Sequence, residues 1–148
     1  MSYLVSKVGI ASDHAGYQLK KEISEYLTKN NIKVTDFGTN SSESMDYPDV
    51  AHPLATAVEN GDLPLGIAIC GSGNGISMTV NKHQGIRAAL CWSSELAALA
   101  RQHNNANILS LPARFINTQT ALSIVDTFLR SEFEGGRHTN RINKIGCK

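Results

Sequence analysis

The sequence has few cysteines, no long apolar run and almost no net charge. Its three cysteines are an odd number, which does not suit a disulfide framework, so we expect a reducing, cytoplasmic setting. No stretch approaches the roughly 18 apolar residues that a membrane span needs, and no apolar signal segment follows Met1. With 14 basic and 13 acidic residues, the formal net charge of +1 gives no strong field for nucleic acid or a membrane surface.

The chain also lacks internal repeats and low-complexity tracts, which excludes repeat arrays and disordered binding segments. Its 148 residues suffice for one domain, 1–148, that buries roughly two-thirds of the surface exposed by the unfolded chain. The five histidines are scattered along the sequence and no pair of cysteines has the spacing of zinc ligands, so we expect no metal site.

Apolar periodicity predicts strands and helices that alternate along the chain. Helices are expected after each strand, and the segment from Arg137 to Lys148 is expected to be helical too. Pro53 leaves the start of the second helix open. Such alternation is typical of a single-domain, Rossmann-like, doubly wound α/β fold, with a five-stranded parallel sheet and helices on both faces. The expected strands are 7–12, 32–37, 65–69, 86–92 and 107–111.

The stretch 69–77, Ile-Cys-Gly-Ser-Gly-Asn-Gly-Ile-Ser, joins the third strand to the third helix. A cysteine at a strand end is often a small buried hydrophobe, but Cys70 would face the exposed N–H groups of a helix start, which favour a thiolate. The glycines permit a flexible turn, and they also leave a nest of N–H donors suited to a developing oxyanion. Cys91 and Cys147 lack this setting and are expected to be inert.

Other polar groups are expected near this loop because ligands of doubly wound folds bind at the carboxyl ends of the strands. Asp13 and His14 follow the first strand there, although Asp13 is equally suited to cap the first helix. His103 continues the apolar helical face of Leu96 and Leu99, so a packed core histidine is the alternative to a functional one.

Arg137 and Arg141 have the i, i+4 spacing that places two side chains on one side of a helix. Two such guanidinium groups can hold one multivalent anion, and a solvated basic face is the alternative. Gly135 and Gly136 precede them and favour the anion site, because they free the backbone to bring a helix start toward a phosphate.

Taken together, a thiolate base, an oxyanion nest, an aspartate, two histidines and an arginine pair suit proton abstraction beside the carbonyl of a phosphorylated sugar. This chemistry is that of an aldose–ketose isomerase. A non-catalytic protein that binds a sugar phosphate is the alternative from another class, since it needs the loop and the arginines but no activated thiol.

Six short motifs follow one another along the chain. They are 12–16 (SDHAG), 46–48 (DYP), 70–77 (CGSGNGIS), 81–82 (NK), 101–104 (RQHN) and 135–138 (GGRH), with Arg141 following. Together they resemble the ribose-5-phosphate isomerases of the B type, a family that includes the galactose-6-phosphate and allose-6-phosphate isomerases. The resemblance runs nearly end to end, and a six-carbon substrate stays open as an alternative to ribose 5-phosphate.

The resemblance implies a base that moves a proton between the first and second sugar carbons, without a cofactor. Cys70 would be that base, Ser72 and the glycine N–H groups would hold the enediolate, and Asp13 and His103 would assist ring opening. The residues that the resemblance implies are, for catalysis, Cys70, Ser72, His103 and Asp13; at the phosphate, His14, Arg137 and Arg141; and elsewhere in the pocket, Tyr47, Gly71, Gly73, Asn74, Gly75, Asn104 and Arg114.

Within the family, one branch replaces the cysteine with a glutamate at the position of Ile76, so the resemblance assigns this chain to the cysteine branch. Asn74 is more typical of the glutamate branch, and Pro112 stands where glycine is usual. Neither departure touches a group that transfers protons.

A homodimer follows from the family and from the order of elements. His103 and Asn104 lie between a helix and the next strand, hence at the amino end of the sheet, whereas Cys70 lies at the carboxyl end. A single chain can therefore hardly bring His103 and Asn104 close to Cys70. We therefore expect His103, Asn104 and Arg114 to enter the site from a partner subunit, while pairing of dimers into tetramers stays open.

Overall fold

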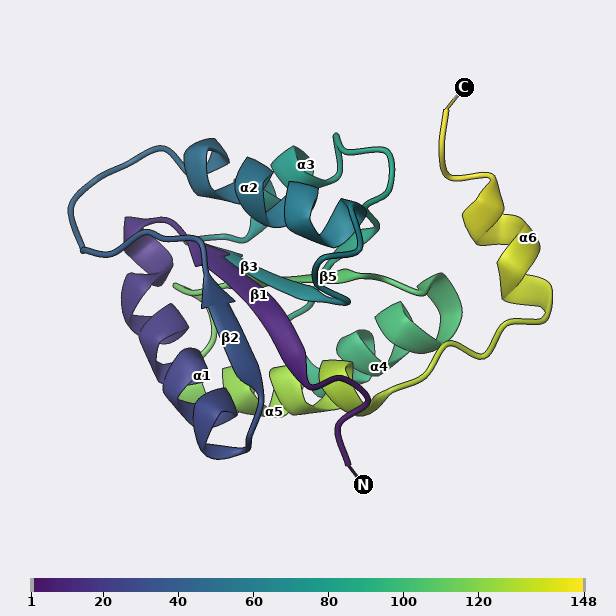
Figure 1. Cartoon of the computed structure of the whole chain (residues 1–148), viewed down its shortest axis with the longest axis horizontal. Helices are drawn as coiled ribbons and strands as arrows, with labels where there is room; N and C mark the ends of the chain where they lie inside the picture. Colours follow the sequence, from purple (N-terminus) through teal and green to yellow (C-terminus); the bar gives the residue numbers. More distant parts are fainter. Residues whose placement is uncertain (1, 148) are drawn as a thin grey trace.

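The structure is a computed structural model that describes residues 2–147. A five-stranded sheet has the strand order β2-β1-β3-β5-β4, and every pair of neighbouring strands is parallel (Figure 1). The doubly wound α/β fold predicted from the sequence is therefore confirmed. The strands are β1 Lys7–Ser12, β2 Lys33–Asp36, β3 Gly66–Cys70, β4 Ala88–Leu90 and β5 Ile108–Pro112. The helices are the 3₁₀ turn η1 His14–Gly16, α1 Tyr17–Lys29, α2 Pro48–Glu59, α3 Asn74–Val80, α4 Ser94–Asn104, α5 Thr118–Arg130 and α6 Arg137–Asn143.

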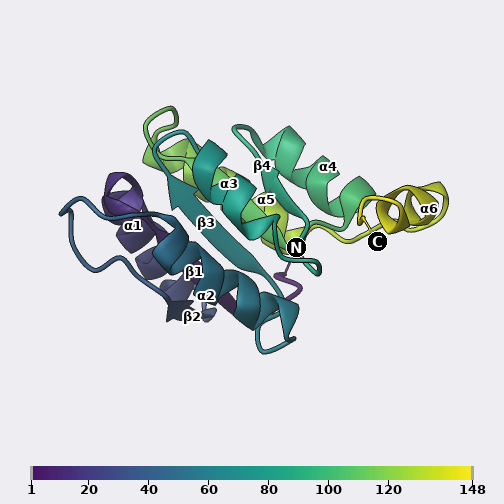
Figure 2. The same cartoon turned by 90° about the horizontal axis from the view of Figure 1, so that it is seen from above.

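The sheet lies between two layers of helices. Helices α1, α4 and α5 cover one face, and α2 and α3 cover the other (Figures 1 and 2). Ile23 and Phe128 belong to the core of the first face, and Leu54 and Ile76 to that of the second. Strands β3 and β5 are buried at every residue because both their faces are covered.

The apolar stripe on each amphipathic helix determines which side of the helix packs against the sheet or a neighbouring helix. In α5 the buried residues Ala121, Ile124, Val125, Phe128 and Leu129 form such a stripe along one side of the helix. In α4 the prediction is partly wrong, because Ala97 and Ala100 are the buried residues while the side chain of Leu99 keeps 37% of its surface exposed. Small residues on the inner face let α4 pack closely on α5.

Four of the five strands have bounds that differ from the predicted ones by one or two residues. Strand β3 ends at Cys70 and not before it, since its ladder with β5 continues to the pair Cys70 and Pro112. Strand β4 is shorter than predicted because the side chain of Asn81 accepts a hydrogen bond from the N–H of Ala88 (2.8 Å) and so borders the strand. Helix α2 begins at Pro48, a favourable first position, and continues through Pro53.

Helix α6 lies at the margin of the molecule beside α4 (Figure 1). Gly135 and Gly136 precede it with φ angles of +69° and +58°, a backbone conformation that favours glycine. The helix was predicted to reach Lys148 but ends at Asn143, and Lys148 lies outside the described residues. In the range 2–147, no helix has the length and apolar character needed to cross a membrane.

Candidate active site

Cys70 occupies the carboxyl end of the central strand β3 and is 4% exposed. Its carbonyl accepts a hydrogen bond from the N–H of Ala113 (2.9 Å), which ties the strand end to the turn after β5. The two other cysteines lie elsewhere. Burial raises the pKa of Cys91 to about 12, so that thiol stays protonated at neutral pH, in agreement with the prediction that it is inert. Cys147 is exposed.

The glycine loop after Cys70 leaves several backbone donors free. Gly73 has φ +76°, a left-handed conformation that favours glycine and turns the chain into α3. The hydroxyl of Ser72 accepts a hydrogen bond from the N–H of Asn74 (3.2 Å). Within the described range 2–147, the N–H groups of Gly71, Ser72, Gly73 and Gly75 have no hydrogen-bond acceptor. The nest of donors predicted from the sequence is thus available to an anion.

Tyr47 closes one side of this loop. Its ring and hydroxyl lie so close to Gly75 that a Cβ at this position would contact both. Tyr47 immediately precedes α2, so the start of α2 and the start of α3 meet here. The structure therefore brings Tyr47, predicted as a substrate-binding residue, to the Cys70 loop.

Asp13 and His14 lie at the carboxyl end of the neighbouring strand β1. The N–H of Asp13 donates to the carbonyl of Ile69 (3.2 Å), one residue before Cys70. The Asp13 carboxylate is buried and accepts from the N–H of Gly16 (3.2 Å), so the predicted capping role is confirmed, on η1. Nδ1 of His14 accepts from the N–H of Met45 (3.2 Å) and holds the loop after β2.

Arg114 also belongs to this group, which corrects the prediction that it enters from a partner subunit. Its N–H donates to the carbonyl of Gly71 (3.0 Å), and a Cβ placed on Gly71 would lie 3.1 Å from Nη1 of Arg114. Arg114 follows β5, and β5 is the neighbour of β3 in the sheet, so both strand ends meet in one chain. The error arose from grouping Arg114 with His103, which lies before β5.

A second group of polar side chains gathers where α4 ends and α6 begins. The imidazole rings of His103 and His138 are stacked, with 4.1 Å between centroids and 15° between planes. Oε1 of Glu134 lies 3.7 Å from Nε2 of His103 and 3.8 Å from Nε2 of His138. His103 is partly exposed, so its reading as a packed core histidine is wrong.

His138 is the buried member of this second group, at 8% exposure. Burial, followed by the proximity of His103 and of the Arg137 guanidinium, lowers the pKa of His138 below its ordinary value. Arg137 and Arg141 are exposed on α6. Neither Glu134 nor His138 was predicted to take part in the site, and the fold brings both side chains to His103.

The two groups lie at opposite ends of the sheet. Asn104 is exposed at the end of α4, and its carbonyl accepts from Nε of Arg87 (3.0 Å), just ahead of β4. This is the amino end of the strands, whereas Cys70 is at the carboxyl end of β3. The prediction that one chain keeps Cys70 and His103 apart is therefore confirmed. Of the predicted site residues, the first group contains Asp13, His14, Tyr47, Cys70, Gly71, Ser72, Gly73, Asn74, Gly75 and Arg114, and the second contains His103, Asn104, Arg137 and Arg141, beside Glu134 and His138.

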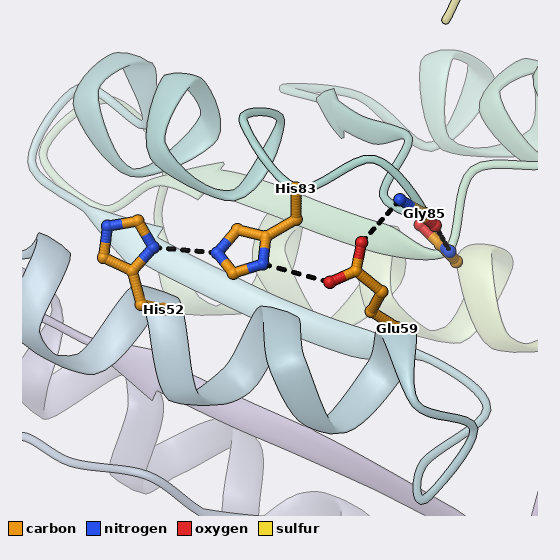
Figure 3. A network of polar contacts seen from close by, with 5 residues as sticks. His52, Glu59, His83 and Gly85 are labelled. Carbon is orange, nitrogen blue, oxygen red and sulfur yellow. Dashed lines mark hydrogen bonds and ion pairs between the residues drawn. The ribbon is translucent and has the colours of Figure 1, made fainter.

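Four histidines that are distant from one another in the sequence form two pairs in the structure. Besides the pair His103 and His138, Nδ1 of His52 lies 2.8 Å from Nε2 of His83, and Nδ1 of His83 lies 3.2 Å from Oε1 of Glu59 (Figure 3). The other carboxylate oxygen of Glu59 accepts from the N–H of Gly85 (2.7 Å). This network connects α2 to the loop after α3. The sequence did not indicate it because His52 and Glu59 are far from His83 and Gly85 in the chain.

The fold and the first group of residues define a doubly wound α/β protein with a thiol and a glycine loop of free N–H donors at the carboxyl ends of its strands. Comparison with protein families gives the finer assignment. The chain belongs to the ribose/galactose isomerase family, whose model matches residues 8–145.

Relatives share both sequence and fold with this chain. Escherichia coli ribose-5-phosphate isomerase B is 43% identical over 141 residues, which cover 95% of this chain and 95% of that protein. The solved structure of Clostridium thermocellum ribose-5-phosphate isomerase B is 53% identical, with a TM-score of 0.93 and 95% coverage of both chains. The crystal structure of the Mycoplasma genitalium enzyme with bound ribulose 5-phosphate is 50% identical, with a TM-score of 0.90 and coverage of 94% and 93%.

Proposed function

We propose that this chain is a type B ribose-5-phosphate isomerase that interconverts D-ribose 5-phosphate and D-ribulose 5-phosphate in the non-oxidative pentose phosphate pathway. The observation that carries this function is the ribulose 5-phosphate bound by a relative that is 50% identical over nearly its whole length. The first group of residues supports it, because a thiol and unpaired N–H donors stand together at the end of β3. The match over 8–145 also supports one domain, 1–148.

In the proposed mechanism Cys70, as a thiolate, removes the proton on C2 of the open-chain aldose. The electron pair of that C–H bond forms the cis-enediolate, the O2 proton passes to O1, and Cys70 returns its proton to C1 to give the ketose. Ser72 and the free N–H groups of the loop hold the negative charge on the enediolate. Asp13 and His103 transfer the protons that open the furanose ring.

The phosphate is held by His14, Arg137 and Arg141 in this proposal. Charge-assisted hydrogen bonds from guanidinium groups suit a dianion, and both arginines are exposed on α6 and free to meet one. Binding energy at the phosphate keeps the reacting carbons beside Cys70. The guanidinium of Arg114, beside Gly71, adds positive charge close to the loop.

A complete site then requires two chains. We infer a homodimer in which the Cys70 group of one subunit faces the His103 group of the other across a two-fold axis. The separation of the two groups within one chain supports this arrangement. Exposed apolar side chains offer an interface, among them Met78 on α3 (66% exposed) and Trp92 after β4 (60% exposed). Because a thiol base must stay reduced, we also infer a cytoplasmic location.

A coupled isomerase assay of the wild-type chain and Cys70→Ala tests the function. We expect turnover of ribose 5-phosphate by the wild type and a loss of about 10²–10⁴-fold in kcat for the variant, because one base carries both proton steps. Cys147→Ser is the matched control for loss of a thiol, and we expect its kcat to be unchanged. Full turnover by Cys70→Ala would remove the thiol from the mechanism.

The same assay tests the substrate and the non-catalytic alternative. Allose 6-phosphate and galactose 6-phosphate are the six-carbon substrates to compare, and preference for either would reassign the chain within its family. Alkylation of Cys70 by iodoacetamide, measured with and without ribose 5-phosphate, adds a second readout. Protection by the substrate, with activity lost in step with alkylation, supports a catalytic thiol, whereas binding without turnover supports a sugar-phosphate sensor.

A further inference from the structure

His103, Glu134 and His138 together have the composition of a transition-metal site. Each offers one ligand atom, and these atoms all lie within 4.8 Å of one another. Two imidazoles and one carboxylate are a ligand set that Zn²⁺ uses in proteins, with a fourth position left to water or a substrate. The assigned residues of the isomerase site include His103 but neither Glu134 nor His138.

The ligand atoms already lie near the spacing that a metal ion requires. Ligand atoms of a tetrahedral zinc centre lie about 3.3 Å apart, given Zn–N and Zn–O distances of about 2.0–2.2 Å. In the structure, Oε1 of Glu134 is 3.7 Å from Nε2 of His103 and 3.8 Å from Nε2 of His138. The near-parallel stack of the two rings places their Nε2 atoms on the same side, toward Glu134. Two stacked rings cannot both aim their in-plane Nε2 lone pairs at one ion, so the partly exposed ring of His103 must rotate out of the stack as the ion binds, and Glu134 must move by a few tenths of an ångström.

The ligands come from three segments that the fold already holds together. His103 is in the last turn of α4, His138 is the second residue of α6, and Glu134 lies in the segment between α5 and α6. The N–H of Glu134 donates to the carbonyl of Gln102 (3.0 Å), which fixes this segment against α4. The main-chain framework therefore exists before any ion binds, and the loss of conformational entropy on binding is small.

The charges nearby select the kind of ion. Arg137 and Arg141 on α6 are close enough to His138 to act on it electrostatically, and they oppose any cation. Glu134 is the one carboxylate among the three ligands. A hard ion such as Mg²⁺, which prefers several oxygen ligands and is held mainly by charge, is therefore disfavoured. Zn²⁺, Ni²⁺ and Co²⁺ bond strongly to imidazole and tolerate this setting.

We propose that His103, Glu134 and His138 form a binding site for an imidazole-preferring transition-metal ion such as Zn²⁺, and that occupancy of this site inhibits the enzyme. Inhibition follows because the ion takes Nε2 of His103, a group assigned to ring opening, and fixes α6, which carries Arg137 and Arg141. The inhibitory part rests on the proposed function, whereas the binding part stands independently of it.

Calorimetric titration of the full-length chain with ZnCl₂ tests the binding. We expect one equivalent of Zn²⁺ per chain, and affinity lower by at least about tenfold in Glu134→Gln and in His138→Ala. Glu134 is exposed, so Glu134→Gln keeps the test valid even if His138→Ala disturbs α6. MgCl₂ should give no binding. Equal affinity for Zn²⁺ in the wild type and in Glu134→Gln would overturn the site.

Two matched controls separate this site from other groups that bind metals. His52→Ala removes a ring from the second histidine pair, and Cys147→Ser removes the exposed thiol. Both variants should bind Zn²⁺ like the wild type, and loss of binding in either would assign the ion elsewhere. The visible absorption of bound Co²⁺, displaced by Zn²⁺, should indicate a four-coordinate site of nitrogen and oxygen ligands.

The isomerase assay then tests inhibition separately. Zn²⁺ should inhibit the wild type at the concentrations that saturate calorimetric binding, and inhibition of Glu134→Gln should need at least about tenfold more. Equal inhibition of both would mean that Zn²⁺ acts through another group, such as Cys70, and would overturn the regulatory role. If the wild type does not turn over ribose 5-phosphate even when no Zn²⁺ is added, the proposed function is wrong. The metal site is then tested by calorimetric binding alone.

Discussion

The N–H of Arg114 donates a hydrogen bond to the carbonyl of Gly71, at 3.0 Å, and its guanidinium lies against the same glycine. This contact joins the turn after β5 to the loop after β3, so Arg114 stands beside the loop that follows Cys70 in its own chain. Gly71 leaves room for the guanidinium because it has no side chain.

Gly71→Ala should therefore act on Arg114. The new Cβ would lie 3.1 Å from Nη1, so the flexible guanidinium must move, whereas the backbone has no positive φ to strain. We expect KM for ribose 5-phosphate to rise about tenfold, which corresponds to about 1.4 kcal/mol, while the free energy of unfolding changes by less than about 0.5 kcal/mol.

A double-mutant cycle with Arg114→Ala checks this cause. In the Arg114→Ala background, Gly71→Ala should have little further effect on KM, because the displaced group is already gone. Two fully additive effects on KM would contradict displacement of Arg114 as the cause.

Subunit mixing tests the shared site. Cys70→Ala and His103→Asn chains should each be nearly inactive as homodimers, because each lacks one group that every site requires. Co-expressed with different affinity tags, the two chains should regain roughly a quarter of wild-type activity, since half of the dimers are mixed and one of their two sites is intact. Purification through both tags should enrich that activity about twofold. Persistent inactivity of the purified mixed dimer would contradict a site built from two chains.

The Glu59 network predicts a pH dependence of stability. Hydrogen bonds from the N–H of Gly85 and then from His83 lower the pKa of the Glu59 carboxyl below its ordinary value of 4.5. The unfolded chain thus binds this proton at higher pH than the folded chain. The stabilisation is complete above pH 4.5 and is lost as the pH falls through the lowered pKa of the folded state.

Thermal unfolding followed between pH 3 and pH 7 by circular dichroism checks this dependence. Glu59→Gln should lower Tm at pH 7 and should flatten the fall of Tm below pH 4.5, whereas Glu25→Gln, on the exposed side of α1, should keep the wild-type profile. If Tm of Glu59→Gln fell with pH in parallel with Tm of the wild type, another carboxyl group would be responsible for the loss of stability at low pH.

The helix and strand pattern was predictable because it depends on residues that are close in the chain. Buried runs such as 66–70 and stripes such as Ala121, Val125 and Phe128 carry their periodicity locally. The Cys70 loop was predictable for the same reason, since a strand, a thiol, glycines and a helix follow one another directly. Asp13 and Tyr47 were found by their motifs, and the fold explains why they meet the loop.

The errors concern relations between segments that are distant in the chain. The strand order β2-β1-β3-β5-β4 makes β5 the neighbour of β3, and this order decides that Arg114 lies beside Gly71. The stack of His103 on His138 depends on the path from α5 to α6, which turns at two glycines with positive φ. Local sequence patterns carry no information about the strand order or about the path from α5 to α6.

The sequence by itself determined the elements, the doubly wound class and the order of strand, thiol, glycine loop and helix at the end of β3, because propensity and periodicity act over a few residues. Tertiary structure alone decided which strand ends are neighbours and which histidines meet, since those contacts arise from packing helices onto both faces of one parallel sheet. The separation of Cys70 from His103 belongs to both levels: the order of elements predicted it, and the folded chain keeps the two residues at opposite ends of the strands.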